Sequence, residues 1–247
     1  MPASLVMHMD ICAELSKSLA AIQTLNSPNS ITRTIDESER VLIAFASTVT
    51  KPLDRIHVCI SRLILTTRAF SQTPTQSDID ENLGLWYRSF AVATDIMHIV
   101  NDLVKTLHID LYGSSFFFHG IVLATCTLLR CLKTNFKDGL SPGEEVAAQA
   151  LFFSAINTLR NLSIAEGDGS ARTAWALQNL WRSDTVFRRA DGSLELALHS
   201  IEESESNLVS DTMWWSRFET RGQSSWCPFK NLQPRKSYTH YCGALIN

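Results

Sequence analysis

The chain has 247 residues, which is enough for one large domain or two small ones. Hydrophobic residues make up 45% of it and charged residues 19%, the opposite of the balance that keeps a chain extensively disordered. The formal net charge of −3 argues against a strongly basic nucleic-acid surface. We therefore expect a folded protein with a substantial core.

The six cysteines lack the spacing of a local metal site. They are Cys12, Cys59, Cys126, Cys131, Cys227 and Cys242. A zinc ribbon or zinc cluster needs cysteine pairs separated by two residues, and no pair in this chain has that spacing. We expect buried free thiols in a reducing compartment, with metal or disulfide chemistry as the alternative.

The N-terminal third predicts three helices. Residues 3–25 carry apolar side chains at every third or fourth position, which is an amphipathic stripe: Leu5, Met9, Cys12, Leu15, Leu19 and Ile22. After a polar break, Thr34 and Glu37 have the spacing of a capping box and predict a helix to about Thr50. Pro52 suits the first turn of the next helix. The side chains of that helix expected to face the core are Ile56, Ile60, Leu63, Ile64 and Thr67.

The centre of the chain predicts two long helices. After a polar linker at 71–77, an acidic start at Asp78 opens a helix that we expect to end at Tyr112. The run Phe116–Leu129 is apolar on nearly every face of a helix, so other helices must enclose it. Its 14 residues, closed by Arg130, fall short of the about 20 that span a membrane. We expect a core helix of a soluble protein.

The clearest helix start lies in the last third. Residues 141–144 combine an N-cap serine, a proline at the first helical position and a capping glutamate, and they predict a helix to Leu162. A glycine-containing break at 167–170 then ends this helical segment, and its residues can cap a new helix that we predict over 171–189.

The C-terminal part changes character. Residues 201–219 predict one more helix with an acidic beginning, whereas 221–247 contain two prolines and no helical period, and we expect a disordered tail. No segment of useful length has the period of a strand. The predicted fold class is all-α: an irregular multi-helix bundle of about eight helices over residues 1–220, with a poorly ordered C-terminal tail.

One polar cluster has the spacing of a chemical site. Asp95, His98 and Asp102 fall on one helix face, where a carboxylate–imidazole pair or two metal ligands could form. We favour the alternative of a solvated face opposite the apolar side of the helix, because no further ligand is evident.

The Asn101-Asp102 step also invites comparison with terpene synthases, all-helical enzymes that bind magnesium through carboxylate-rich motifs. Their motif needs a hydroxyl four positions after the asparagine and a carboxylate eight positions after it. Here Lys105 and Ile109 occupy those positions, and an ammonium repels magnesium. We therefore expect no enzyme of this kind.

Aromatic side chains at helical spacing are most often core residues. An apolar space between helices can nevertheless admit a small effector. The candidate residues that line such a pocket, or the core itself, are Trp86, Phe90, Phe117, His119, Trp181 and Trp214.

Several apolar groups follow one another in a fixed order along the chain. They are Phe116-Phe117-Phe118, Leu128-Leu129-Arg130 and Leu132-Lys133, then Leu151-Phe152-Phe153-Ser154-Ala155-Ile156, Leu159-Arg160, Ala171-Arg172 and Leu180-Trp181-Arg182-Ser183. This series resembles the fungal-specific regulatory domain of binuclear zinc-cluster transcription factors, in the subgroup of the leucine-biosynthesis regulator and the extracellular-protease activator. The likeness runs from about residue 50 to 190 and touches Asp211-Thr212-Met213-Trp214-Trp215.

The resemblance implies a regulatory region in the nucleus. It implies contacts with the transcription machinery or related transcription factors and a small-molecule effector, with no enzymatic activity, no membrane and no direct DNA binding by this chain. Zinc is implied only for the family's N-terminal six-cysteine module, which we expect to be missing from a fragment or shortened gene model, so we expect no cofactor. The alternatives are a stand-alone helical protein that competes with full-length relatives and, less favoured, an all-helical enzyme.

Overall fold

The computed structural model is all-helical, which confirms the predicted fold class. It describes residues 3–25, 27–68, 76–112, 115–165 and 168–188, together with Leu194, Val209 and Thr212. The elements are α1 (Ala3–Gln23), α2 (Pro28–Thr48), α3 (Pro52–Thr67), α4 (Gln76–Leu107), α5 (Ile109–Tyr112), α6 (Ser115–Lys133), the 3-10 turn η2 (Asn135–Gly139), α7 (Pro142–Asn161) and α8 (Gly169–Arg182). The predicted tail, 221–247, and Trp214 lie outside the described residues.

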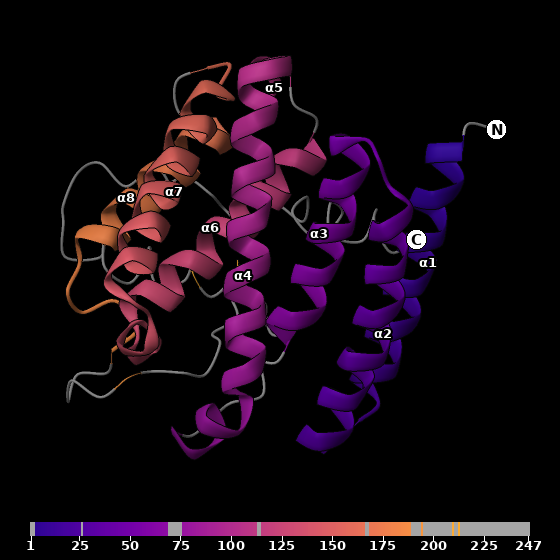
Figure 1. Ribbon diagram of the computed structural model, residues 1–247. Coiled ribbons are helices and arrows are strands. Elements are labelled where there is room, and N and C mark those ends of the chain that lie inside the picture. The colour runs from indigo at the N-terminus through magenta and orange to yellow at the C-terminus, as the bar shows by residue number, and fades with distance from the viewer. Residues whose placement is uncertain are drawn as a thin grey trace, which may run out of the picture.

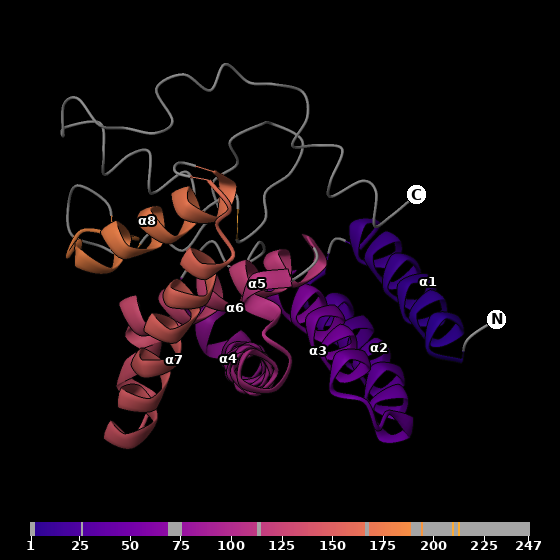
Figure 2. The ribbon, with the colours of Figure 1, turned by 90° about the horizontal axis from the view of Figure 1, so that it is seen from above.

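The long helix α4 runs through the middle of the molecule, with α1 to α3 on one side and α7 and α8 on the other, while α6 crosses behind it (Figure 1). Seen from above, α4 lies end-on between these two groups, and α1 is the outermost helix of its group (Figure 2). The principal contacts agree, because α4 packs against α3, α6 and α7, whereas α1 packs against α2 and α3.

Two hydrophobic clusters fill the bundle. The larger one lies between α3, α4, α6, α7 and α8, and the smaller one joins α1 and α2 to the other side of α3. Helix α3 serves both, since Ile56 and Leu63 belong to the larger cluster and Val58 and Leu65 to the smaller. The burial predicted for this helix is confirmed at Ile56, Ile60, Leu63 and Thr67, while Ile64 is half-buried and packs against both clusters.

The enclosure predicted for α6 is also confirmed. Every residue from Gly120 to Leu132 is buried except Leu123, which is half-buried, as are the three phenylalanines 116–118. By length and composition alone, the stretch Phe116–Lys133 could cross a membrane, but 67% of it is buried inside the bundle. Neighbouring helices therefore cover most of its apolar surface.

Two of the predicted helix starts are confirmed in atomic detail. Ser141 caps α7: its hydroxyl oxygen accepts from the amide of Glu144 at 3.3 Å, and the Glu144 carboxylate accepts from the Ser141 amide at 2.8 Å. The Ser141 hydroxyl also donates to the Glu144 carboxylate at 2.6 Å. This hydrogen bond and, second to it, the one from the Ser141 amide lower the pKa of Glu144. Asp168 caps α8 by accepting from the amide of Ala171 at 2.9 Å.

The capping box predicted at Thr34 is wrong. Helix α2 begins six residues earlier, at Pro28, with Ser27 as its N-cap. Thr34 lies inside the helix, where its hydroxyl donates to the carbonyl oxygen of Ser30 at 2.9 Å, and Glu37 pairs with Arg33. Pro28 is the first residue of α2, a position where proline is favourable. This signal for the helix start outweighs the capping-box spacing of Thr34 and Glu37.

Two predicted helix ends are also displaced. The long helix does not continue to Tyr112, because His108 takes a φ of 50° and separates α4 from α5. Helix α8 ends at Arg182 and not at residue 189. At both places the chain turns without a glycine or proline, so no local signal marked the end.

The stripe predicted on α1 is wrong in its first half. Leu5, Met9 and Cys12 are exposed, whereas Ile11, Leu19 and Ile22 are buried. The buried face of α1 is therefore rotated relative to the predicted one. An outer helix that packs on only two neighbours can leave apolar side chains on its free side.

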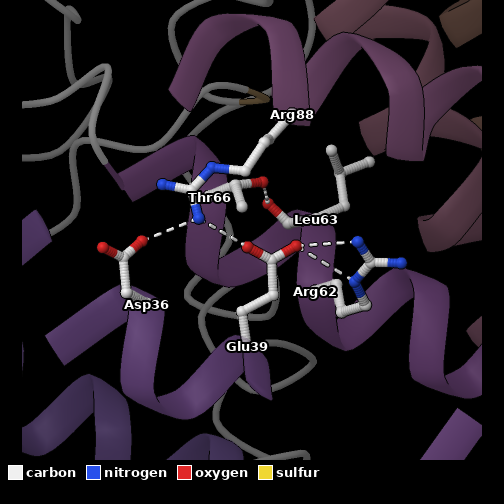
Figure 3. A network of polar contacts seen from close by, with 6 residues as sticks. All are labelled: Asp36, Glu39, Arg62, Leu63, Thr66 and Arg88. Atoms are coloured by element: carbon white, nitrogen blue, oxygen red, sulfur yellow. Dashed lines mark hydrogen bonds and ion pairs between the residues drawn. The ribbon is translucent and has the colours of Figure 1, made fainter. Parts of the chain in front are cut away.

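A polar network fastens α2 to the central helices (Figure 3). Glu39 of α2 is only 4% exposed. Its carboxylate accepts from Arg62 of α3 at 2.8 Å and from Arg88 of α4 at 2.9 Å, and Arg88 also pairs with Asp36 at 2.7 Å. Charge-assisted hydrogen bonds of this kind compensate the burial of the carboxylate.

Candidate functional site

Between Leu128 and Ser183, the residues that carry the family resemblance lie where α6, α7 and α8 meet, whereas Phe116, Phe117 and Phe118 lie near the other end of α6. Several apolar members are buried in the larger cluster, among them Leu128, Leu129, Phe152, Leu159 and Leu180, whereas Phe153 is exposed. The polar and aromatic members at the same junction make specific contacts with one another. We treat this junction as the candidate functional site.

Arg130 is the most unusual residue of the junction, because its side chain is 0% exposed. The guanidinium carbon lies 4.9 Å from the ring centroid of Phe187, a cation–π contact. Phe187 is itself fully buried and has a φ of 59°, which is rare for a residue with a side chain. The segment after α8 is thus held against α6 in a strained conformation.

Lys133, three positions further along α6, holds the end of α8. Its ammonium donates to the carbonyl oxygen of Ser183, the C-cap of α8, at 3.0 Å and lies 5.2 Å from the Trp181 ring centroid. A cation at this position complements the negative end of the helix dipole. Burial lowers the pKa of Lys133, nearby Asp184 opposes that shift, and Lys137 adds to it.

Trp181 joins α8 to α7 through its ring. It stacks on Phe152 with centroids 4.9 Å apart and meets the edge of Phe153 at 5.2 Å. The indole is half-buried, so the core position predicted for it is only partly realised. Aromatic pairs in these geometries add to the stabilisation from buried area.

The chemistry available at this junction is that of packing and recognition. A guanidinium stays protonated at all ordinary pH values and cannot serve as a base. The Lys133 ammonium is engaged by a carbonyl oxygen and an indole face. Cationic groups over aromatic rings fix the relative positions of three helices and the segment that follows them.

The structure does not bring the predicted pocket residues together. Trp86 and Phe90 both face the ring of Phe136, at 6.0 and 5.6 Å, beside η2. Phe117 is half-buried and His119 exposed near the other end of α6, while Trp181 lies at the junction described above. The candidates with described positions thus fall in three separate places, and Trp214 lies outside the described residues.

Asp95, His98 and Asp102 are all exposed, as the solvated-face interpretation predicted. Within the described part of the chain, no three histidine, cysteine or carboxylate side chains are arranged to hold a metal ion.

The predicted burial of the cysteines is confirmed for Cys59, Cys126 and Cys131 and wrong for Cys12, while Cys227 and Cys242 lie outside the described residues. Burial raises the pKa of Cys131, which keeps that sulfur a thiol.

Sequence reasoning missed the burial of Arg130 and treated it as the polar end of an apolar run. One signal could have found it: apolar or small residues continue past Arg130 to Leu132 in the same helix. No local sequence pattern identifies Phe187 as the partner of Arg130, because the contact depends on where the chain turns after α8.

Comparisons of the chain with protein-family models, with curated proteins and with solved structures found no significant match.

Proposed function

We propose that this chain is a regulatory region of the type found in fungal zinc-cluster transcription factors. In this proposal it works in the nucleus, through contacts with the transcription machinery or related factors, and it neither catalyses a reaction nor enters a membrane. The observation that carries the proposal is that resembling residues from α6, α7 and α8 meet at one junction, around Arg130, Lys133 and Trp181.

Two further features support a role in protein contacts. Apolar side chains are exposed on the outer helices, with Leu5, Val6 and Met9 on α1 and Val41 and Ile43 on α2. Such side chains offer hydrophobic contact area to another protein. The net charge of −3 does not favour direct contact with DNA, so a separate module would have to supply DNA binding.

A tethering assay tests the proposal. The full chain is fused between a heterologous DNA-binding domain and an activation segment, and reporter transcription is measured in yeast. We expect the chain to change reporter output severalfold relative to the same fusion without it. Replacing Leu5, Val6 and Met9 by glutamate should reduce the effect, whereas glutamate at exposed Lys17 and Ala20 should not. Unchanged output with well-expressed fusions would contradict the proposal.

The same exposed side chains favour a second function, in which the chain competes with full-length relatives. In a gel-shift assay with a full-length zinc-cluster factor, this function requires that the added chain reduce DNA binding in proportion to its concentration. A regulatory region that acts only in its own polypeptide would leave the shift unchanged.

A further inference from the structure

Three aromatic rings from three helices form a stack at the edge of the bundle. His57 of α3 lies between His8 of α1 and Phe116 of α6, and both ring centroids are 3.9 Å from its own. The interplanar angles are 23° and 11°, so the rings are nearly parallel. Gly120 permits the close crossing of α6 and α3, because a Cβ there would lie 2.2 Å from Cδ1 of Ile60.

A buried carboxylate adds to this stack. Asp54 of α3 is 9% exposed, and its Oδ1 accepts from the hydroxyl of Ser4 and lies 3.1 Å from Nε2 of His8. The order of contacts is not that of a hydrolytic triad, because Ser4 contacts the carboxylate and no imidazole activates its hydroxyl. Parallel rings also cannot both direct a nitrogen at one metal ion.

These contacts determine how the first half of α1 is attached. No described residue of α1 before Ile11 is buried, and the apolar Leu5, Val6 and Met9 are exposed. Buried apolar side chains fasten only the second half of the helix, through Leu19 and Ile22, with Ile11 at the boundary. In the first half, the half-buried Met7 packs against the smaller cluster. This half is therefore held by Met7 together with the contacts of Ser4 and His8.

We propose that the His8–His57–Phe116 stack, with Asp54, is a proton-operated latch that releases the first half of α1 when the solution becomes acidic. Two imidazoles stacked face to face repel each other once both carry a proton. The groups that face His57 are His8 on α1, Asp54 on its own helix and the uncharged Phe116 on α6. One carboxylate, already shared with Ser4, does not balance two imidazolium charges.

The direction of the pH effect follows from His57. Burial and the neighbouring His8 lower its pKa to about 4, and Asp54 opposes this shift. Release of α1 removes His8 and part of the burial, so the pKa of His57 moves back toward its ordinary value of 6.5 and the imidazole binds protons more readily than it does in the stack. The contribution of His57 to the attachment is thus at full strength above pH 6.5, weakens as the pH falls and changes no further below about 4.

Hydrogen exchange of the full chain, read by mass spectrometry and corrected for the chemical rate, tests this latch. When the pH falls from 6.5 to 4.5, we expect the opening constant of peptides from the first half of α1 to rise about tenfold. This expected rise takes into account that solvent screens the partly exposed His57 and weakens the effect of its pKa shift. Peptides from α7 serve as the internal reference. His57→Phe keeps a flat ring in the stack and should abolish the rise. His8→Phe removes the repulsion between the imidazoles but leaves His57 buried, so it should make the rise smaller.

His98→Gln is the matched control, since His98 is exposed on α4 and should leave the rise intact. Three results would overturn the proposal: no rise in the unmodified chain, the same rise in both phenylalanine variants, or an equal rise in α1 and α7, which would indicate global unfolding. Having two separate variants keeps the test decisive if one of them fails to fold.

Discussion

Trp181 is stabilised by ring contacts and an ammonium rather than by complete burial. Its indole stacks on Phe152 and lies beneath the Lys133 ammonium while remaining half-buried. Trp181→Ala should lower the free energy of unfolding by about 2–3 kcal/mol, less than a fully enclosed ring would cost. Urea denaturation measures this loss. Trp181→Phe, which can retain a stacked pair, should cost clearly less, and equal losses for the two variants would argue against the ring contacts.

Leu129 and Phe117 occupy the same apolar helix but differ in burial. Leu129 is 0% exposed, whereas Phe117 is half-buried. Leu129→Asp should therefore unfold the protein, because an unpaired buried charge costs several kcal/mol. Phe117→Asp should leave a folded protein with a lower melting temperature, since its carboxylate can reach water.

Thermal melts followed by circular dichroism compare the two aspartate variants. Leu129→Met, which conserves volume, is the control and should cost less than about 1.5 kcal/mol. If Leu129→Asp melted like the unmodified chain, the enclosure of α6 would be wrong.

At the scale of single elements, two capping motifs predicted with the same reasoning can be compared directly. Ser141 caps α7 and exchanges hydrogen bonds with Glu144, whereas Thr34 lies inside α2. Ser141→Ala should cost about 1 kcal/mol of stability. Thr34→Ala should be close to neutral or slightly stabilising, because alanine has the higher helix propensity. Urea midpoints at equal m values provide the comparison, and a larger loss for Thr34→Ala would contradict the observed start of α2.

The elements themselves were largely predictable from the sequence. Prolines at helix starts marked α3 and α7, and a continuous run of apolar side chains marked α6. Apart from the start of α2, where Pro28 is a local signal, the errors occurred where tertiary contacts determine the structure, as at His108, which takes a positive φ without being glycine. On α1, the choice of buried face depended on packing against α2 and α3, which local periodicity does not encode.

The junction of α6, α7 and α8 was predictable only in part. Order and spacing pointed to the residues around Arg130 and Trp181, but not to the contacts between them. Arg130 meets Phe187 across 57 positions of sequence, and such pairings depend on how helices cross. Glu39 likewise accepts hydrogen bonds from arginines 23 and 49 positions away. In the sequence alone, none of these three residues can be distinguished from an ordinary charged surface residue.

At the scale of the whole molecule, the two hydrophobic clusters differ in size, and this difference should govern how the protein opens. The smaller cluster unites α1 and α2 with one side of α3, while the larger includes α4, α6, α7 and α8. Local opening requires less free energy where fewer apolar contacts are lost. At neutral pH, α1 and α2 should therefore exchange their amide hydrogens through openings of lower free energy than those of α6 and α7.

Native-state hydrogen exchange in increasing urea measures these opening free energies helix by helix. Glu39→Gln weakens the charge-assisted hydrogen bonds from α2 to Arg62 and Arg88, so it should lower the opening free energy of α1 and α2 by about 2 kcal/mol. The α7 amides should change much less, because their core does not depend on that carboxylate. Identical opening free energies for all helices would instead mean that the bundle unfolds as one cooperative unit, with α3 coupling the clusters too strongly for either to open alone.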